Sequence, residues 1–236
     1  MIRVVSLVPS LTESAISLGV TPIACTRFCE QPTLAHVGGT KNPDIDAIIA
    51  LRPDLVLLDR EENREQDADA LSAAGLALHV TQVRAVSDVS PMLADLAAAL
   101  GVGVGAKPPA LQALGDSSTA AFVPIWRRPW MTISAATYGS SLLSAIGVAN
   151  VFADHPDAYP TVTLDVVRER SPQLVLLPSE PYSFTSRHED ELRDVLPGVE
   201  IRSIDGQDLF WWGTRTHAAI GRLRASIGQI DGPSSP

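Results

Sequence analysis

The sequence predicts an α/β fold of two Rossmann-like lobes, whose parallel sheets flank an interlobe cleft and which a shortened helical linker joins. Three observations predict this class. Apolar runs of strand length alternate with helical segments, which is typical of parallel α/β architecture. Glycines follow the ends of several predicted helices. The order of elements in the first half recurs in the second, which indicates an internal duplication.

The first half alternates predicted strands with predicted helices. The strands are expected at residues 3–8, 21–25, 55–58 and 76–80. The helices are expected from a Ser10-to-Glu13 capping box to Leu18, over 45–51 with Asp44 as cap, over 65–74 and over 92–100. The run 55–58 is apolar throughout, as expected for a strand that helices cover on both faces.

The second half repeats this order. Ser134 and the helix that ends before Gly147 match Ser6 and the helix that ends before Gly19, at an offset of 128 residues. The second match pairs residues 164–177 with 45–58 at an offset of 119, and the third pairs 198–203 with 75–80. A further strand is expected at 120–126. Any two βα units look alike, but three matches in one order favour duplication.

The repeat predicts an N-terminal lobe of residues 1–105, a linker or helix over 106–119 and a C-terminal lobe of 120–236. Ligands of open parallel sheets bind beyond the carboxyl ends of the strands. Two such edges that face each other predict a cleft between the lobes.

The composition excludes several partners. A net charge of −9 argues against nucleic acid and against an anionic membrane surface, since both would repel the chain. No apolar stretch reaches the roughly 18 residues that span a bilayer. Residues 2–8 look like a core strand and lack the features of a secretory signal. As written the protein is therefore expected in the cytoplasm, or outside it if the start is truncated or misassigned, and as a monomer.

Polar and aromatic residues gather directly after the predicted strands, as a site for a flat, partly apolar ligand requires. These segments are residues 26–32, 59–64, 178–184 and 208–213. For Phe210, Trp211 and Trp212 in the last segment, packing in a lobe core is an equally good interpretation.

No catalytic constellation is present in the sequence. The histidines are scattered without a metal-ligand spacing, and Ser140-Ser141 lacks the frame of a nucleophile elbow. Cys25 and Cys29 could staple a turn or bind a metal with His36, but free thiols are favoured. These absences favour binding over catalysis, with no catalytic residues, metal site or required cofactor.

Several short motifs, taken together, resemble one family. They are Val5-Ser6-Leu7-Val8-Pro9-Ser10-Leu11-Thr12-Glu13, Thr26-Arg27-Phe28-Cys29, Val37-Gly38-Gly39-Thr40-Lys41-Asn42-Pro43-Asp44, Glu61-Glu62-Asn63-Arg64, Trp126-Arg127-Arg128-Pro129-Trp130-Met131 and Pro178-Ser179-Glu180-Pro181-Tyr182. The chain thereby resembles the helical-backbone metal receptor superfamily, the substrate-binding proteins of ABC importers for vitamin B12, haem and ferric siderophores. The cobalamin-binding branch is the nearest.

The resemblance implies a small-molecule ligand, a corrinoid or related metal chelate, held between two lobes. The ligand-binding residues that it implies are Phe28, Glu30, Glu61, Glu62, Trp130, Tyr138, Tyr182, Phe184 and Trp212. It also implies one exposed acidic residue on each lobe that docks onto a membrane permease. Glu65 fits the first lobe, and Glu189 or Glu180 fits the second.

The chain departs from this family in its linker. A helix over residues 109–115 would cover only about 10 Å, whereas a 20-residue helix covers about 30 Å. One alternative is a cytoplasmic corrinoid sensor or carrier on the same scaffold. The other is an enzyme that uses Glu61, Glu62 or Cys29, which would need a perturbed pKa at one of them.

Overall fold

The computed structural model describes residues 2–103 and 119–228, and these divide into two compact units. Unit 1 comprises residues 2–83, 87–103 and 212–215; unit 2 comprises 84–86, 119–211 and 216–228. The predicted linker 106–119 lies outside the described residues except for Thr119. In the described residues no helix is long and apolar enough to cross a membrane.

Unit 1 is built on a parallel sheet with strand order β3-β2-β1-β6-β7. Its strands are β1 (Val4–Ser6), β2 (Ala24–Cys25), β3 (Ala35–His36), β6 (Leu55–Asp59) and β7 (Leu78–Thr81). A short antiparallel hairpin of β4 (Gly38–Gly39) and β5 (Asn42–Pro43) follows β3. Every residue of β1 and β6 is buried, which explains why their sequences are nearly continuous apolar runs.

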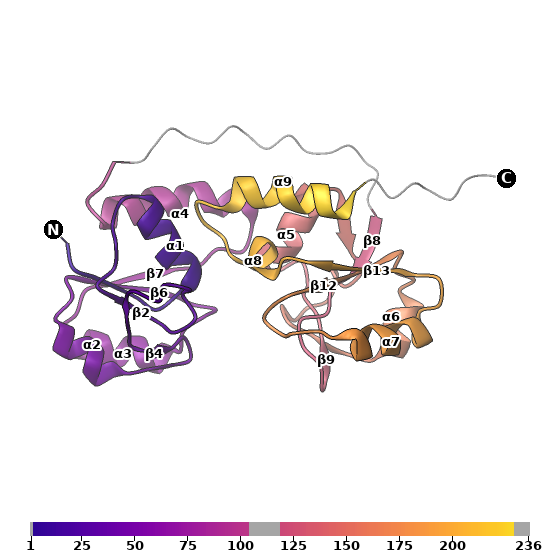
Figure 1. Cartoon of the computed structure of the whole chain (residues 1–236), viewed down its shortest axis with the longest axis horizontal. Coiled ribbons are helices and arrows are strands. Elements are labelled where there is room, and N and C mark those ends of the chain that lie inside the picture. Colours follow the sequence, from indigo (N-terminus) through magenta and orange to yellow (C-terminus); the bar gives the residue numbers. More distant parts are fainter. Residues whose placement is uncertain (1, 104–118, 229–236) are drawn as a thin grey trace. The chain divides into compact units, whose positions relative to one another are not determined.

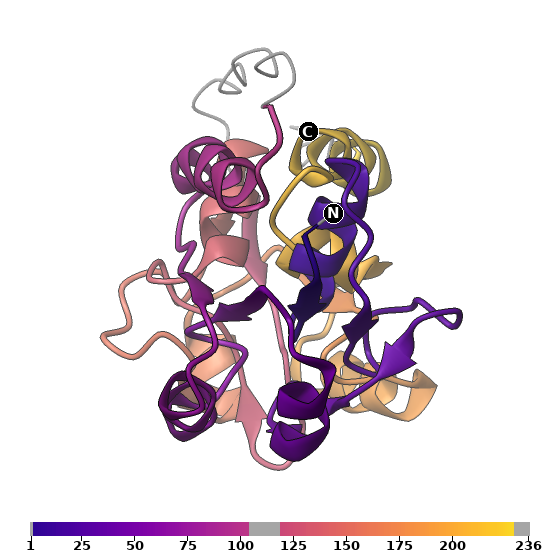
Figure 2. The same cartoon turned by 90° about the vertical axis from the view of Figure 1, so that its left-hand side faces the viewer.

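Helices cover both faces of this sheet. On one side lie α1 (Pro9–Ser17) and α4 (Val86–Ala99); on the other lie α2 (Ile45–Leu51) and α3 (Glu65–Ala73), as Figures 1 and 2 show. The α2 and α3 side buries an apolar core between sheet and helices. Its buried members are Val5, Leu7, Ala24, Val37, Ile48, Val56, Leu58 and Leu71.

Unit 2 repeats this plan with the parallel strand order β10-β8-β12-β13. Its strands are β8 (Thr119–Phe122), β10 (Val148–Asn150), β12 (Leu174–Pro178) and β13 (Glu200–Ile204), and a separate antiparallel pair joins β9 (Trp130–Met131) to β11 (Thr161–Val162). Its helices are α5 (Tyr138–Ala145), α6 (Leu164–Glu169), α7 (Ser186–Val195), α8 (Gly206–Phe210) and α9 (Thr216–Ile227). In Figure 1, α6 and α7 lie across the sheet from α5, α8 and α9.

The strand orders confirm the internal repeat, because β10-β8-β12-β13 has the chain order of β2-β1-β6-β7. Gly19 and Gly147 follow α1 and α5 with φ of 88° and 81°, a left-handed conformation that favours glycine. The match of Ser6 to Ser134 was wrong. The counterpart of β1 is β8, and Ser134 lies in a segment that follows it. The backbone N–H of Ser134 donates to the Ala158 carbonyl at 2.9 Å instead of to the sheet.

Two helix starts differ from expectation. The Ser10 capping box is absent, because α1 begins at Pro9 with Val8 as its N-cap residue. Proline suits this first position since it has no N–H to satisfy. Helix α4 begins at Val86, before the predicted start, and carries Pro91. The Asp44 cap of α2 is confirmed, with the Ala47 N–H donating to Asp44 Oδ1 at 3.0 Å.

Candidate ligand-binding site

The strands of unit 1 are parallel, so their carboxyl ends share one edge of the sheet. A buried amide organises this edge. Asn63 Nδ2 donates to the Leu7 carbonyl at 3.2 Å and to the Thr40 carbonyl at 3.0 Å, and Asn63 Oδ1 accepts from the Asp59 N–H at 2.9 Å. One side chain thus fixes the loops that follow β1, β4 and β6. The sequence analysis missed this role, although Asn63 stands inside one of the quoted motifs.

Phe28 lies on the loop after β2 and is half exposed, with a relative accessibility of 50%. The guanidinium of Arg27 lies over its ring at 4.9 Å from the centroid. Gly39 makes room for both, since an added Cβ would come within 3.0 Å of Phe28 Cε2 and 3.2 Å of Arg27 Nη2. The predicted ligand residue Phe28 is therefore an exposed aromatic surface held in place by its neighbours. Glu30, two residues after Phe28, is exposed and has a positive φ of 52°.

Three carboxylates lie at the end of β6 and directly after it, on Asp59, Glu61 and Glu62. Asp59 is buried and accepts from Thr81 Oγ1 at 2.7 Å and from the Glu61 N–H at 2.9 Å, yet burial still raises its pKa. Solvent reaches Glu62, but the protein around it displaces much of the water and raises its pKa, and the charge of Asp59 adds to the rise. Lys41 Nζ donates to the Glu61 carbonyl at 2.5 Å and brings one positive charge to this group.

Cys25 and Cys29 are free thiols buried beneath the Phe28 loop. Cys29 Sγ lies 3.2 Å from both Thr12 Oγ1 and Thr26 Oγ1. A hydrogen bond from Cys25, followed by these hydroxyls, lowers the pKa of Cys29 against the effect of burial; the same pairing raises the pKa of Cys25. Within the described ranges no three His, Cys, Asp or Glu side chains are grouped to hold a metal ion.

The corresponding edge of unit 2 carries a chain of aromatic rings. Trp126 packs edge-on against Tyr182 with centroids 5.2 Å apart, Tyr182 lies 5.0 Å from Phe184, and Phe184 stacks on Trp130 at 6.0 Å. Trp126 is 44% exposed, whereas Trp130 is buried in the unit's core. The sequence analysis named Tyr182, Phe184 and Trp130 but missed Trp126, whose place in a quoted motif was the available signal.

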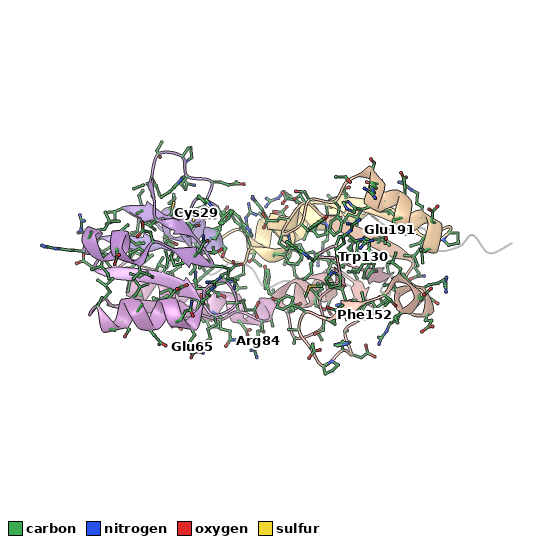
Figure 3. The ribbon with its side chains drawn as sticks, turned by 90° about the horizontal axis from the view of Figure 1, so that it is seen from below. Cys29, Glu65, Arg84, Trp130, Phe152 and Glu191 are labelled. Atoms are coloured by element: carbon green, nitrogen blue, oxygen red, sulfur yellow. The ribbon has the colours of Figure 1, made fainter. Side chains whose placement is uncertain are left out.

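Polar side chains hold this aromatic chain. Arg127 forms a two-pronged ion pair with Glu191 of α7 and lies over the Trp130 ring at 4.8 Å from the centroid. Figure 3 shows Trp130 and Glu191 close together in unit 2. His188 Nδ1 accepts from the Thr185 N–H at 2.9 Å, and His188 Nε2 lies 3.4 Å from the Tyr182 hydroxyl.

Three of the predicted ligand residues are buried. Trp130 is in the unit 2 core, Tyr138 begins α5 with its hydroxyl 2.9 Å from Thr216 Oγ1, and Trp212 is 6% exposed. Their positions favour packing roles behind the exposed residues. The ligand-binding roles of all nine residues remain predictions.

The acidic candidates for permease docking differ in their surroundings. Glu65 is exposed in the first turn of α3. Glu189 lies in the first turn of α7, which follows β12 as α3 follows β6, and pairs with Arg193 at 2.8 Å. Glu180 Oε1 instead accepts from the Trp211 indole N–H at 2.6 Å within unit 2. Glu189 is therefore the better counterpart of Glu65.

Known proteins with related sequences and folds are binding proteins. The chain is 28% identical over 203 residues to a vitamin B12-binding protein of Pectobacterium carotovorum, covering 78% of this chain and 74% of that protein. The structure of the periplasmic vitamin B12-binding protein of Vibrio cholerae matches 96% of this chain and 98% of that one, with a TM-score of 0.71 and 18% identity. The structure of a periplasmic haem-binding protein of Roseiflexus matches 95% of this chain and 97% of that one, with a TM-score of 0.78 and 18% identity. No family model matches the sequence.

The two parallel-sheet units, with polar and aromatic groups at their carboxyl edges, have the fold of these periplasmic binding proteins, and the relatives are named for binding. The chain is thus similar to proteins named for binding vitamin B12 and haem, the class of protein that the resemblance of its motifs predicted.

Proposed function

We propose that the chain is the substrate-binding protein of an ABC importer and holds a corrinoid or a related metal chelate. The observation that carries this proposal is the exposed aromatic surface on the carboxyl edge of each sheet, Phe28 in unit 1 and Trp126 with Tyr182 in unit 2. Flat, partly apolar ligands bind to aromatic walls with a few polar groups beside them. The relatives named for vitamin B12 and haem support this ligand class.

The cleft between the units stays a prediction, as do the domain boundaries at 105 and 120. Loops from both units contact the ligand in this proposal. Phe28, Glu61, Glu62 and Tyr182 are its first contacts because their side chains reach solvent.

We further propose that the protein works outside the cytoplasm. The cytoplasmic expectation has no support among the relatives, since the matched solved structures are named as periplasmic proteins. The cytoplasmic sensor or carrier loses its support for the same reason. The perturbed pKa values of Glu62 and Cys29 meet one requirement of an enzyme, but these relatives are named for binding.

A titration of the apo protein against cyanocobalamin, haem and a ferric hydroxamate chelate tests the ligand class. We expect saturable one-to-one binding of at least one of them. A ligand that binds only the folded state at 100 times its Kd adds about 2.7 kcal/mol to stability. Saturating amounts of all three with no change in melting temperature or absorption spectrum would overturn the proposal.

Two variants locate the contacts. We expect Phe28→Ala and Tyr182→Ala each to lower the affinity for the bound ligand by about tenfold, because each removes an aromatic contact. Val166→Ala is the matched control, since Val166 is also an exposed apolar side chain but lies on α6. Equal affinities for all three variants would place the site elsewhere.

We propose that Glu65 and Glu189 dock onto the permease. Glu65→Ala and Glu189→Ala should lower ligand uptake by a purified corrinoid importer in proteoliposomes and leave the affinity for free ligand unchanged. Glu169→Ala, which changes an exposed acid on α6, serves as the control. Full uptake with both variants would contradict the docking role.

A further inference from the structure

Two buried thiols lie together under the loop that carries Phe28. Cys25 ends β2, and the Cys29 N–H donates to the Thr26 carbonyl at 3.1 Å, which closes a turn and brings Cys29 back toward the strand end. Each thiol is the main influence on the pKa of the other, as expected of two sulfurs that lie close together. Cys29 keeps 3% of its surface exposed and Cys25 none. Figure 3 marks Cys29 in unit 1. The proposed ligand-binding function leaves this pair without a role.

Hydrogen-bond donors surround the sulfur of Cys29. Thr26 Oγ1 accepts from the Phe28 N–H at 3.4 Å, so its own hydroxyl proton can point to Cys29 Sγ at 3.2 Å. Thr12 Oγ1 approaches the same sulfur at 3.2 Å and shares its proton with the Val8 carbonyl. Donors of this kind stabilise the anionic form of sulfur. The pKa of Cys29 is lowered first by its interaction with Cys25 and then by these two hydroxyls, against the effect of burial.

We propose that Cys25 and Cys29 are a modification site, at which a hydroperoxide converts the thiol pair into an intramolecular disulfide. The Cys29 thiolate attacks one peroxide oxygen, the O–O bond breaks, and Cys29 sulfenic acid and hydroxide form. The Cys25 sulfur then attacks the sulfenic sulfur, the S–O bond breaks, and the oxygen leaves as water with the Cys25 proton. In total two thiols are oxidised to one disulfide, and one hydrogen peroxide is reduced to two waters.

The surroundings assign the order of these steps. Cys29 is the first to react, because it has the residual exposure and the donors that favour a thiolate. Cys25 resolves, because it is wholly enclosed and Cys29 is the main influence on its pKa, as expected of a neighbouring sulfur. A metal-binding role for the pair has no support among the described residues, where no third His, Cys, Asp or Glu is grouped with the two thiols to hold a metal ion.

Disulfide formation changes the loop. The two sulfurs must come closer together than the distance of a hydrogen bond. The hydroxyl groups of Thr12 and Thr26 also lose the thiolate that accepts their hydrogen bonds. Phe28 is the residue next to Cys29, so its ring should shift over Gly39 when the bond forms. Oxidation would therefore change the aromatic surface of unit 1.

Exposure of the reduced full chain to hydrogen peroxide, followed by denaturation, alkylation of free thiols and peptide mapping, tests the site. We expect a Cys25–Cys29 disulfide that dithiothreitol reverses. Cys25→Ser should stop at oxidised Cys29, whereas Cys29→Ser should leave Cys25 free to alkylate. Thr26→Val should slow the reaction by about threefold to tenfold, because it removes one donor to the thiolate.

Complete alkylation of both thiols in the wild type, under peroxide that oxidises the urea-unfolded chain, would overturn the proposal. Equal oxidation of Cys25 in the Cys29→Ser variant would overturn the assigned order. These measurements need no ligand. The disulfide proposal can therefore be overturned while the ligand-binding proposal stands, and the ligand-binding proposal can be overturned while the disulfide proposal stands.

Discussion

Arg127 donates hydrogen bonds to both carboxylate oxygens of Glu191. Arg127 Nε donates to Oε2 at 3.0 Å, and Nη2 donates to Oε1 at 2.5 Å. The pair joins the segment after β8 to helix α7 and lies against the Trp130 ring. It therefore holds together the two parts of the chain that supply the aromatic rings of unit 2.

Glu191→Gln should destabilise the protein by about 1 kcal/mol at neutral pH, because it removes a two-pronged but partly exposed ion pair. Arg127 lowers the pKa of Glu191, so the pair stabilises the fold above the ordinary glutamate pKa and loses its effect as pH falls through the lowered value. Urea unfolding from pH 7 down to pH 3 measures this, and the variant should approach the wild type at the acid end. An equal difference at every pH would show that charge is not the cause.

Arg222→Gln should cost about 2 kcal/mol, because it leaves the enclosed carboxylate of Asp208 without its two-pronged partner. Asp208 is 4% exposed in its side chain. Arg168→Gln is the control, since the Arg168–Asp165 pair lies at the surface and should contribute less than about 0.5 kcal/mol. Thermal unfolding of both variants should show a larger loss of stability for Arg222→Gln. Similar losses of stability in the two variants would show that burial of Asp208 does not strengthen its ion pair.

Glu62→Gln should stabilise the free protein slightly at pH 7, by less than about 1 kcal/mol because solvent screens the charge. The pKa of Glu62 is raised in the folded state, so its stabilising effect is complete at acid pH and is lost as pH rises through the folded value. At pH values above the folded-state pKa of Glu62 the variant should be more stable than the wild type. At acid pH the two should be equally stable. Glu62→Asp keeps the charge and should show no gain in pH-dependent melting experiments.

Gly39→Ala should weaken ligand binding about fivefold with little loss of stability, because its Cβ displaces Phe28 and Arg27 from their positions. Asn42 Oδ1, at 2.6 Å from that Cβ, must also move, but it ends a flexible side chain. Gly103→Ala is the matched control, since nothing lies within 4 Å of its added Cβ. Ligand titration measures the affinity of both variants, and melting curves measure their stability. An unchanged affinity of Gly39→Ala would exclude Phe28 from the site.

The sequence alone determined the fold class, the internal repeat and the loops on which the candidate residues lie. It could do so because strand and helix periodicities, the Asp44 cap and the glycines after helices are local signals. It also singled out Phe28 and Tyr182, since aromatic residues directly after parallel strands share one edge of a sheet.

Only the tertiary structure decided how those loops are held and which side chains remain exposed. Asn63 joins three loops through contacts 23 and 56 residues away in sequence, and Glu191 meets Arg127 across 64 residues. The inserted segment before α5 displaced Ser134 from the place of Ser6, because its backbone bonds to residues 158–160 rather than to the sheet. The burial of Trp130, like the exposure of Trp126, depends on such long-range packing, which no local pattern encodes.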